Sequence, residues 1–360
     1  MHNLTLEIDR RNHAVTRLVD EPLLELQPGQ VRFRIDRYAV TANTVTYAVT
    51  GDLLGYYDFF PAAPGWGRVP AMGWAEVVAS AHPDVAPGRR YYGWFPMSRF
   101  VDVTVTPTQD GLRDDGTHRA AHAPVYRAYT ETDRDPFYQS GADAEDRHAL
   151  LRGLFVTGFL AEDFFADNDY FGGTRVLVLS ASSKTAIGFA QCADARAGIE
   201  VIGVTSRTNH PFVHGLGCYD EAITYDEIDT IPARTPIVSI DMSGNGQVLE
   251  RVHTHFADQL KHSMAIGRSH HDAPPRTEGL PGPRPAFFFA PTQVKKRVQD
   301  WGPRGYQERI AAALHQFVAA SNAWLHVTRS SGPDAAATTW RAVHGATVPP
   351  DVGHVVSMWE

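Results

Sequence analysis

The chain has 360 residues, of which 43% are hydrophobic and 21% are charged, so it can bury a sizeable core and is not a disordered or low-complexity protein. Its 33 Lys and Arg against 41 Asp and Glu give a net charge of −8, without any block of like charge. This balance gives no basis for a nucleic-acid or anionic-membrane partner, and it favours a small-molecule partner.

Cysteine content and the N-terminus indicate where the protein resides. Two cysteines, Cys192 and Cys218, cannot form a disulfide framework or a thiolate-rich zinc site. Residues 1–11 contain no apolar signal-peptide core, and no uncharged apolar run approaches the roughly 18 residues of a membrane span. We therefore expect a cytoplasmic protein that does not enter a membrane.

The first 105 or so residues carry short patterns typical of β-strands. Residues 31–35 alternate apolar and polar side chains, and residues 74–80 form a second short apolar run. Proline–glycine turns at residues 28–29, 64–67 and 87–88 separate such pieces. This spacing predicts a partly open barrel or sandwich.

The pattern changes after a polar stretch that ends near residue 122. Apolar residues at three-to-four spacing predict a helix over 146–165, and a second helix is predicted at 184–195. Buried strands are predicted at residues 175–180, 200–205, 237–241 and 286–289, and a last strand at 354–358. Residues 147–315 should therefore form an open, mostly parallel α/β sheet.

The turn after the first buried strand of this sheet is where a dinucleotide pyrophosphate would sit, at a helix N-terminus. Its sequence, Ser-Ala-Ser-Ser-Lys-Thr-Ala-Ile-Gly over residues 180–188, lacks the usual glycines. Ser182, Ser183, Lys184 and Thr185 instead offer hydroxyl groups and one cation to an anion. The simpler alternative, that Ser182 or Ser183 is only a helix N-cap, is compatible with phosphate binding.

The end of the second strand bears on the choice of nicotinamide cofactor. An Asp or Glu there would bind the ribose 2′-hydroxyl of NAD, but this sequence has Thr-Ser-Arg-Thr-Asn at residues 205–209. Arg207 could hold a 2′-phosphate bidentately and Ser206 could donate to it, which favours NADP. The alternative is that Arg207 is a solvated loop residue.

These segments together resemble a known family. Residues 176–179 with their turn, 198–205 and 215–225 look like the cofactor domain of the medium-chain dehydrogenase/reductase superfamily, in particular its zinc-free quinone and enoyl reductases. Residues 41–47, the serine-rich turn and residues 298–302 more narrowly resemble an uncharacterised branch of it. The resemblance implies an α/β protein that forms a homodimer.

The resemblance also implies how the chain is divided. A GroES-like β-rich domain would comprise residues 1–146 and 316–360, and a doubly wound Rossmann-type domain would comprise residues 147–315. The zinc-dependent branch has a cysteine in its first domain and a four-cysteine lobe, both of which this sequence lacks, so no metal is expected. We interpret the clustered His262, His270 and His271 as a polar loop.

Further site residues follow from the resemblance. Asn43 and Thr157 match positions beside the nicotinamide in the zinc-free reductases, and Tyr225 ends the family's Leu-Gly-Ala-Asp-like segment as a cofactor-site tyrosine. Tyr47 follows Asn43 by four residues, so a helical turn would place both on one face. Tyr47 is the candidate catalytic residue, as a proton donor or a hydrogen-bond donor to an enolate oxygen; the alternative is a packed aromatic.

Other aromatic residues are expected to contribute mainly to the core. Most of those between residues 56 and 94 should be buried, while a minority could line an apolar substrate cleft. Residues 126–129, Tyr-Arg-Ala-Tyr, are interpreted as part of a surface loop.

The preferred function is NADPH-dependent reduction of a small apolar conjugated carbonyl or ketone, without zinc. Two alternatives remain open. One is a lyase or other non-redox enzyme with a remodelled nucleotide site, and the other is a non-catalytic small-molecule or redox-sensing protein.

Overall fold

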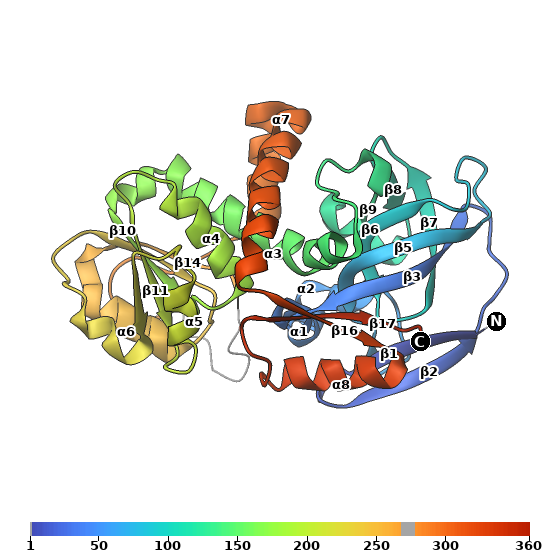
Figure 1. The fold of residues 1–360 in the computed structure, drawn as a ribbon, viewed down its shortest axis with the longest axis horizontal. Helices are drawn as coiled ribbons and strands as arrows, with labels where there is room; N and C mark the ends of the chain where they lie inside the picture. Colours follow the sequence, from blue (N-terminus) through green and yellow to red (C-terminus); the bar gives the residue numbers. More distant parts are fainter. Residues whose placement is uncertain (1, 268–277) are drawn as a thin grey trace. The chain divides into compact units, whose positions relative to one another are not determined.

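The structure, a computed structural model, describes residues 2–267 and 278–360. The chain divides into two compact units (Figure 1). Unit 1 comprises Met1–Leu150 and Leu325–Glu360, and unit 2 comprises Leu151–Trp324.

Unit 1 is built on an eight-stranded sheet that closes on itself. The strand order is β16-β17-β3-β5-β6-β9-β8-β7, and β7 also pairs with β3. Its strands are β3 (Gln30–Val40), β5 (Pro70–Ser80), β6 (Arg90–Pro96), β7 (Phe100–Pro107), β8 (Gly111–Asp114), β9 (Ala128–Glu131), β16 (His326–Ser331) and β17 (Val352–Ser357). The alternation predicted at residues 31–35 is confirmed, because Val31, Phe33 and Ile35 are buried in β3.

Unit 1 also contains a second sheet and the helices α1, α2 and α8. The sheet has the order β2-β1-β4. Its strands are β1 (His2–Asp9), β2 (Thr16–Pro22) and β4 (Trp66–Gly67), and the helices are α1 (Ala42–Val49), α2 (Gly51–Leu54) and α8 (Pro333–His344). Helix α8 is attached by Trp340, which is fully buried and donates from its indole nitrogen to the carbonyl oxygen of His13 at 2.7 Å.

Unit 2 contains a six-stranded parallel sheet with the order β12-β11-β10-β13-β14-β15. Its strands are β10 (Arg175–Leu179), β11 (Glu200–Thr205), β12 (Glu221–Thr224), β13 (Ile237–Asp241), β14 (Leu260–Ala265) and β15 (Ala286–Phe287). The chain adds β11 and β12 on one side of β10 and then returns to place β13 on the other. The strand order therefore reverses between β10 and β13, where open α/β sheets bind ligands.

Helices cover both faces of this sheet (Figure 1). Successive residues of β10 enter different cores: Val176 and Val178 pack with residues of α3 (Ala142–Asp167) and α4 (Lys184–Asp194), while Leu177 and Leu179 pack with residues of α6 (Gly246–Phe256). Both faces being buried explains the uninterrupted apolar run at β10. With α5 (His210–Gly215), this arrangement confirms the predicted doubly wound α/β class.

Two predictions about the later strands need correction. His262 does not lie in a polar loop but in β14, where its ring stacks on Phe171 with centroids 4.0 Å apart; His270 and His271 lie outside the described residues. The polar residues Lys261 and His262 interrupt the apolar pattern, so the sequence did not predict this strand. The strand predicted at 286–289 is shorter, since β15 ends at Phe287.

The longest helix, α7 (Ala290–Ala320), is broken in its middle. Gly302 has a φ of 73°, and Pro303 follows it, so the backbone leaves the helical conformation there and resumes it. Across the described ranges, no helix combines the length and apolar character needed to cross a membrane.

Candidate functional site

The turn between β10 and α4 forms the N-terminal end of a helix at the point of strand reversal. Ser183 is the N-cap of α4, and its Oγ accepts from the backbone N–H of Ala186 at 3.3 Å. Residues 182–185 are partly exposed, whereas their neighbours Ala181 and Ala186 are buried. The four predicted cofactor residues of this turn are therefore its accessible part.

Two serine hydroxyls of this turn each accept a hydrogen bond from the protein. Ser182 Oγ accepts from Asn209 Nδ2 at 3.1 Å, and Ser183 Oγ accepts from Ala186. Each hydroxyl hydrogen can thus be directed to a further acceptor. The first N–H groups of a helix have no intrahelical acceptor, so this turn has the donors of an anion site although it lacks the glycines.

Ser180, the first residue of the turn, adopts a conformation that favours glycine, with a φ of 61°. Substituting Ser180 by Gly and by Ala removes the same hydroxyl, but only Ala keeps a Cβ in the left-handed region. We expect Ser180→Gly to be more stable than Ser180→Ala by about 1 kcal/mol. Urea unfolding of the two variants measures the difference, and equal stability would contradict the assigned backbone strain.

Tyr225 and Asp241 lie beside Ser180. Tyr225 follows β12 and hydrogen-bonds to Ser180, and burial raises the pKa of its phenol to about 12. Asp241 ends β13 and accepts from Ser243 Oγ at 2.6 Å. Burial raises the pKa of Asp241, while hydrogen bonds from Ser243 and Gly244 oppose this shift. Tyr225 thus belongs to the same strand-end cluster as the serine-rich turn.

Ser206 and Arg207 follow β11 at the same edge of the sheet. Asn209 joins the two loops, because its backbone N–H donates to Ser206 Oγ at 3.2 Å and its side chain donates to Ser182. Arg207 is 81% exposed and forms an ion pair with Asp226 at 3.0 Å. Sequence reasoning missed both Asn209, whose role depends on folding, and Asp226, which is 19 residues from its partner.

Thr157 lies on α3 within unit 2. Its Oγ1 donates to the carbonyl oxygen of Gly153 at 2.9 Å. The next residue, Gly158, packs so closely on α4 that an added Cβ would lie 2.6 Å from the carbonyl oxygen of Thr185. Thr157 is therefore one residue from the contact between α3 and the first turn of α4.

In unit 1, Asn43 and Tyr47 lie on helix α1, as the predicted helical turn required. Thr41 caps this helix and exchanges hydrogen bonds with Thr44. Tyr47 is 7% exposed, and its phenol accepts from Trp94 Nε1 at 3.3 Å and hydrogen-bonds to Asn43. Burial and the neighbouring Tyr126 raise the pKa of Tyr47, so its phenol is protonated at neutral pH.

Tyr47 belongs to an aromatic cluster, which we define as Tyr47, Tyr56, Trp94 and Tyr126. The ring centroids of Tyr47 and Tyr56 are 4.5 Å apart, and Tyr126 lies 6.0 Å from Tyr56 and 5.4 Å from Trp94. Burial raises the pKa of Tyr56 to about 12, and Tyr126 hydrogen-bonds to it. The interpretation of residues 126–129 as a surface loop is wrong for Tyr129, which is buried in β9.

The buried side chain of Arg119 contacts Tyr126 of this cluster. Its guanidinium lies 4.1 Å from the centre of the Phe59 ring and donates to the carbonyl oxygen of Tyr126. Leu53, which is 82% exposed on α2, precedes Tyr56 by three residues in the chain. The contacts of Arg119 thus hold Tyr126, one member of the cluster, in place.

The structure brings the predicted residues together in two groups. Asn43 and Tyr47 meet in unit 1, and the turn residues, Ser206, Arg207, Tyr225 and Thr157 belong to unit 2. Within residues 2–267 and 278–360, no three His, Cys, Asp or Glu side chains are grouped to hold a metal ion.

Comparisons with solved structures show the fold. CurA from Vibrio vulnificus matches with a TM-score of 0.64 at 14% identity, covering 99% of each chain. The yhdH oxidoreductase from Salmonella enterica, solved with NADP, matches with a TM-score of 0.55 at 17% identity, again over 99% of each chain. The quinone oxidoreductase from Coxiella burnetii matches with a TM-score of 0.51 at 14% identity. The expected GroES-like and Rossmann-type fold of the medium-chain dehydrogenases/reductases is confirmed.

Comparisons of sequence give a narrower assignment. No curated protein matches the chain. One family model, described as "Protein of unknown function (DUF2855)", matches residues 38–349. This match spans most of the 360 residues, and it includes α1, the serine-rich turn and the break in α7. The chain therefore belongs to the DUF2855 family.

Proposed function

We propose that the protein is an NADPH-dependent oxidoreductase that reduces a small, apolar conjugated carbonyl or ketone. The observation that carries this proposal is the donor-rich N-terminus of α4 at the point of strand reversal, with Arg207 at the end of the next strand. The residues fit a dinucleotide: Ser182, Ser183 and the first N–H groups of α4 would hold its pyrophosphate.

Arg207 and Ser206 would hold the 2′-phosphate, which distinguishes NADPH from NADH. Structural neighbours support this choice, since the Salmonella enterica protein was solved with NADP, and both CurA and the mycobacterial Rv1454c were solved with NADPH. Lys184 and Thr185 lie on the same turn, and Tyr225 and Thr157 would contribute to the same cofactor site. We further propose that the protein is cytoplasmic, as its two cysteines suggest, and that it forms a homodimer, as the family resemblance implies.

The bound cofactor would supply a hydride to the electrophilic carbon of the substrate. The chain's own contribution is a proton or hydrogen bond at the substrate oxygen, which we assign to the Tyr47 phenol. Its raised pKa makes full proton transfer harder but keeps the hydrogen available to stabilise an enolate oxygen. Asn43 and Trp94 fix the phenol, and the reaction uses no metal.

The Arg207–Asp226 ion pair provides a test of cofactor selectivity. Arg207→Ala should weaken NADPH binding by about 1–3 kcal/mol and leave NADH binding nearly unchanged, because only NADPH carries the phosphate. Asp226→Asn frees Arg207 from an exposed pair, so it should strengthen NADPH binding by about 0.3–1 kcal/mol. Fluorescence titration measures both effects. Equal weakening of both cofactors by Arg207→Ala would contradict the assignment.

A further inference from the structure

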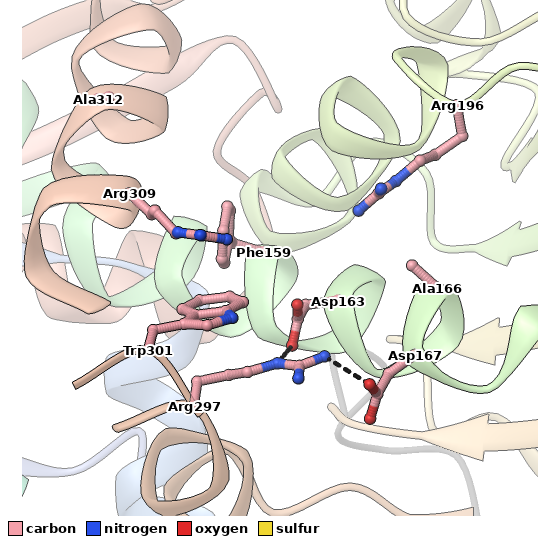
Figure 2. A pocket seen from close by; sticks show the side chains of 9 residues that line it. All are labelled: Phe159, Asp163, Ala166, Asp167, Arg196, Arg297, Trp301, Arg309 and Ala312. Atoms are coloured by element: carbon pink, nitrogen blue, oxygen red, sulfur yellow. Dashed lines mark hydrogen bonds and ion pairs between the residues drawn. The ribbon is translucent and has the colours of Figure 1, made fainter. Parts of the chain in front are cut away.

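A cavity of about 600 Å³ lies in unit 2, between α3 and the broken helix α7 (Figure 2). Nine side chains line it: Phe159, Asp163, Ala166, Asp167, Arg196, Arg297, Trp301, Arg309 and Ala312. Trp301 belongs to the segment 298–302, which resembles an uncharacterised branch of the superfamily, and it has no part in the proposed function. Arg196 follows the C-terminal end of α4, about 16 Å along the helix from the dinucleotide turn.

Ion pairs centred on Arg297 hold together one side of the cavity, which we call its floor. Arg297 Nε lies 2.5 Å from Asp163 Oδ2, its Nη2 lies 3.0 Å from Asp167 Oδ1, and its Nη1 lies 2.8 Å from Asp300 Oδ2. Lys296 also pairs with Asp167 at 2.8 Å. The donors of Arg297 are therefore engaged, and the surrounding carboxylates disfavour a ligand that carries several negative charges.

Two other arginines face the open space. Arg309 lies 4.6 Å from the centre of the Trp301 ring, and Arg297 lies 4.9 Å from it; Figure 2 shows the ring between them. Within the described ranges, no carboxylate pairs with the exposed Arg309. Arg196 is held through Nε and Nη2 by Glu162 at 2.8 and 2.9 Å, and its guanidinium points toward the cavity in Figure 2.

We propose that this cavity binds a small organic carboxylate. Arg309 has its donors available for a planar oxyanion, and Arg196 can add its remaining Nη1. The apolar body of the ligand would pack against Phe159, Ala166 and Ala312. A single negative charge suits the site, because a dianion would be repelled by the carboxylates of the floor.

The test measures binding of 4-fluorobenzoate to the full chain by fluorine NMR. Excess NADPH is present so that the ligand does not bind at the proposed cofactor site instead of the cavity. The cavity should bind it with a dissociation constant of about 1 mM, the range for so small a ligand. Trifluoroacetate, which lacks the apolar body, should bind about tenfold more weakly. Phenyl phosphate, a dianion, should compete poorly.

Four variants locate the binding. Arg309→Ala should weaken it at least about tenfold, the effect of one charge-assisted contact. Ala312→Glu adds a carboxylate three residues from Arg309 on α7, where it would occupy the guanidinium and repel the ligand, so it should have a similar effect. Their matched controls on α7 are Arg304→Ala, which removes a residue that is 91% exposed and paired with Glu308, and Ala319→Glu. Both should bind like the parent.

Binding to the parent that is lost in Arg309→Ala and Ala312→Glu, but kept in both controls, would support the proposal. Absence of line broadening at about 10 mM ligand, or equal weakening in variant and control, would overturn it. So would tighter binding of phenyl phosphate than of 4-fluorobenzoate. None of these outcomes depends on whether the protein is a reductase.

Discussion

Replacing Tyr47 by Phe should lower turnover by about 10²–10⁴-fold, the usual effect of losing a catalytic proton or hydrogen-bond donor. The change removes one oxygen atom and keeps the ring that packs on Tyr56 at 4.5 Å. Trp94 Nε1 loses its acceptor, but Trp94 is only half-buried and can bond to water instead. We therefore expect a stability loss of no more than about 1 kcal/mol and unchanged NADPH affinity.

Tyr38→Phe is the matched control for this experiment. Tyr38 is a fully buried tyrosine of the same unit, and its hydroxyl has no hydrogen-bond partner within the described residues. Removing that hydroxyl should leave turnover unchanged and stability equal or higher. Parent-like turnover in a folded Tyr47→Phe protein would refute the catalytic role, and so would an equal loss of turnover in both variants.

Replacing Arg37 by Met should destabilise the protein by about 1.5–3 kcal/mol, the usual effect of removing hydrogen bonds to buried charged groups. Arg37 lies on β3 and pairs with two acids at the start of α3, Glu145 and Asp146, which are 5% and 1% exposed. Arg90 still contacts Glu145 and Arg329 still contacts Asp146 in the variant. The two carboxylates would nevertheless lose a cation that contacts both of them.

Urea unfolding measures this loss, and Arg304→Met is its control. Arg304 is 91% exposed and forms an ion pair with Glu308 four residues along α7, so its removal should cost no more than about 0.5 kcal/mol. A loss below about 1 kcal/mol for Arg37→Met would mean that Arg90 and Arg329 compensate for the missing guanidinium. That result would contradict the assigned structural role.

The fold could be predicted where burial follows a simple period. Residues 31–35 alternate because one face of β3 is buried, and residues 176–179 are all apolar because both faces of β10 are covered. The period fails at β14, where Lys261 is exposed and His262 is half-buried, with its ring stacked on Phe171. Stacking partners distant in the chain leave no local signal, so this strand escaped prediction.

The candidate site was predictable in part for a similar reason. The four-residue spacing of Asn43 and Tyr47 is local, and α1 does place them on one face. Trp94 and Tyr126 reach Tyr47 and Tyr56 only through pairing of distant strands and turns. Likewise, the positive φ of Ser180 could not be foreseen, because serine rarely adopts that conformation.

Calorimetric titration of the purified full-length chain with NADPH and with NADH tests the central claim most directly. The account predicts one NADPH per chain, bound about 10–100-fold more tightly than NADH, since a charge-assisted phosphate contact contributes about 1–3 kcal/mol. Saturating NADPH should also raise the melting temperature. Binding of neither dinucleotide would contradict the account and favour a non-redox enzyme or binding protein on this fold, while tighter binding of NADH would refute the role of Arg207.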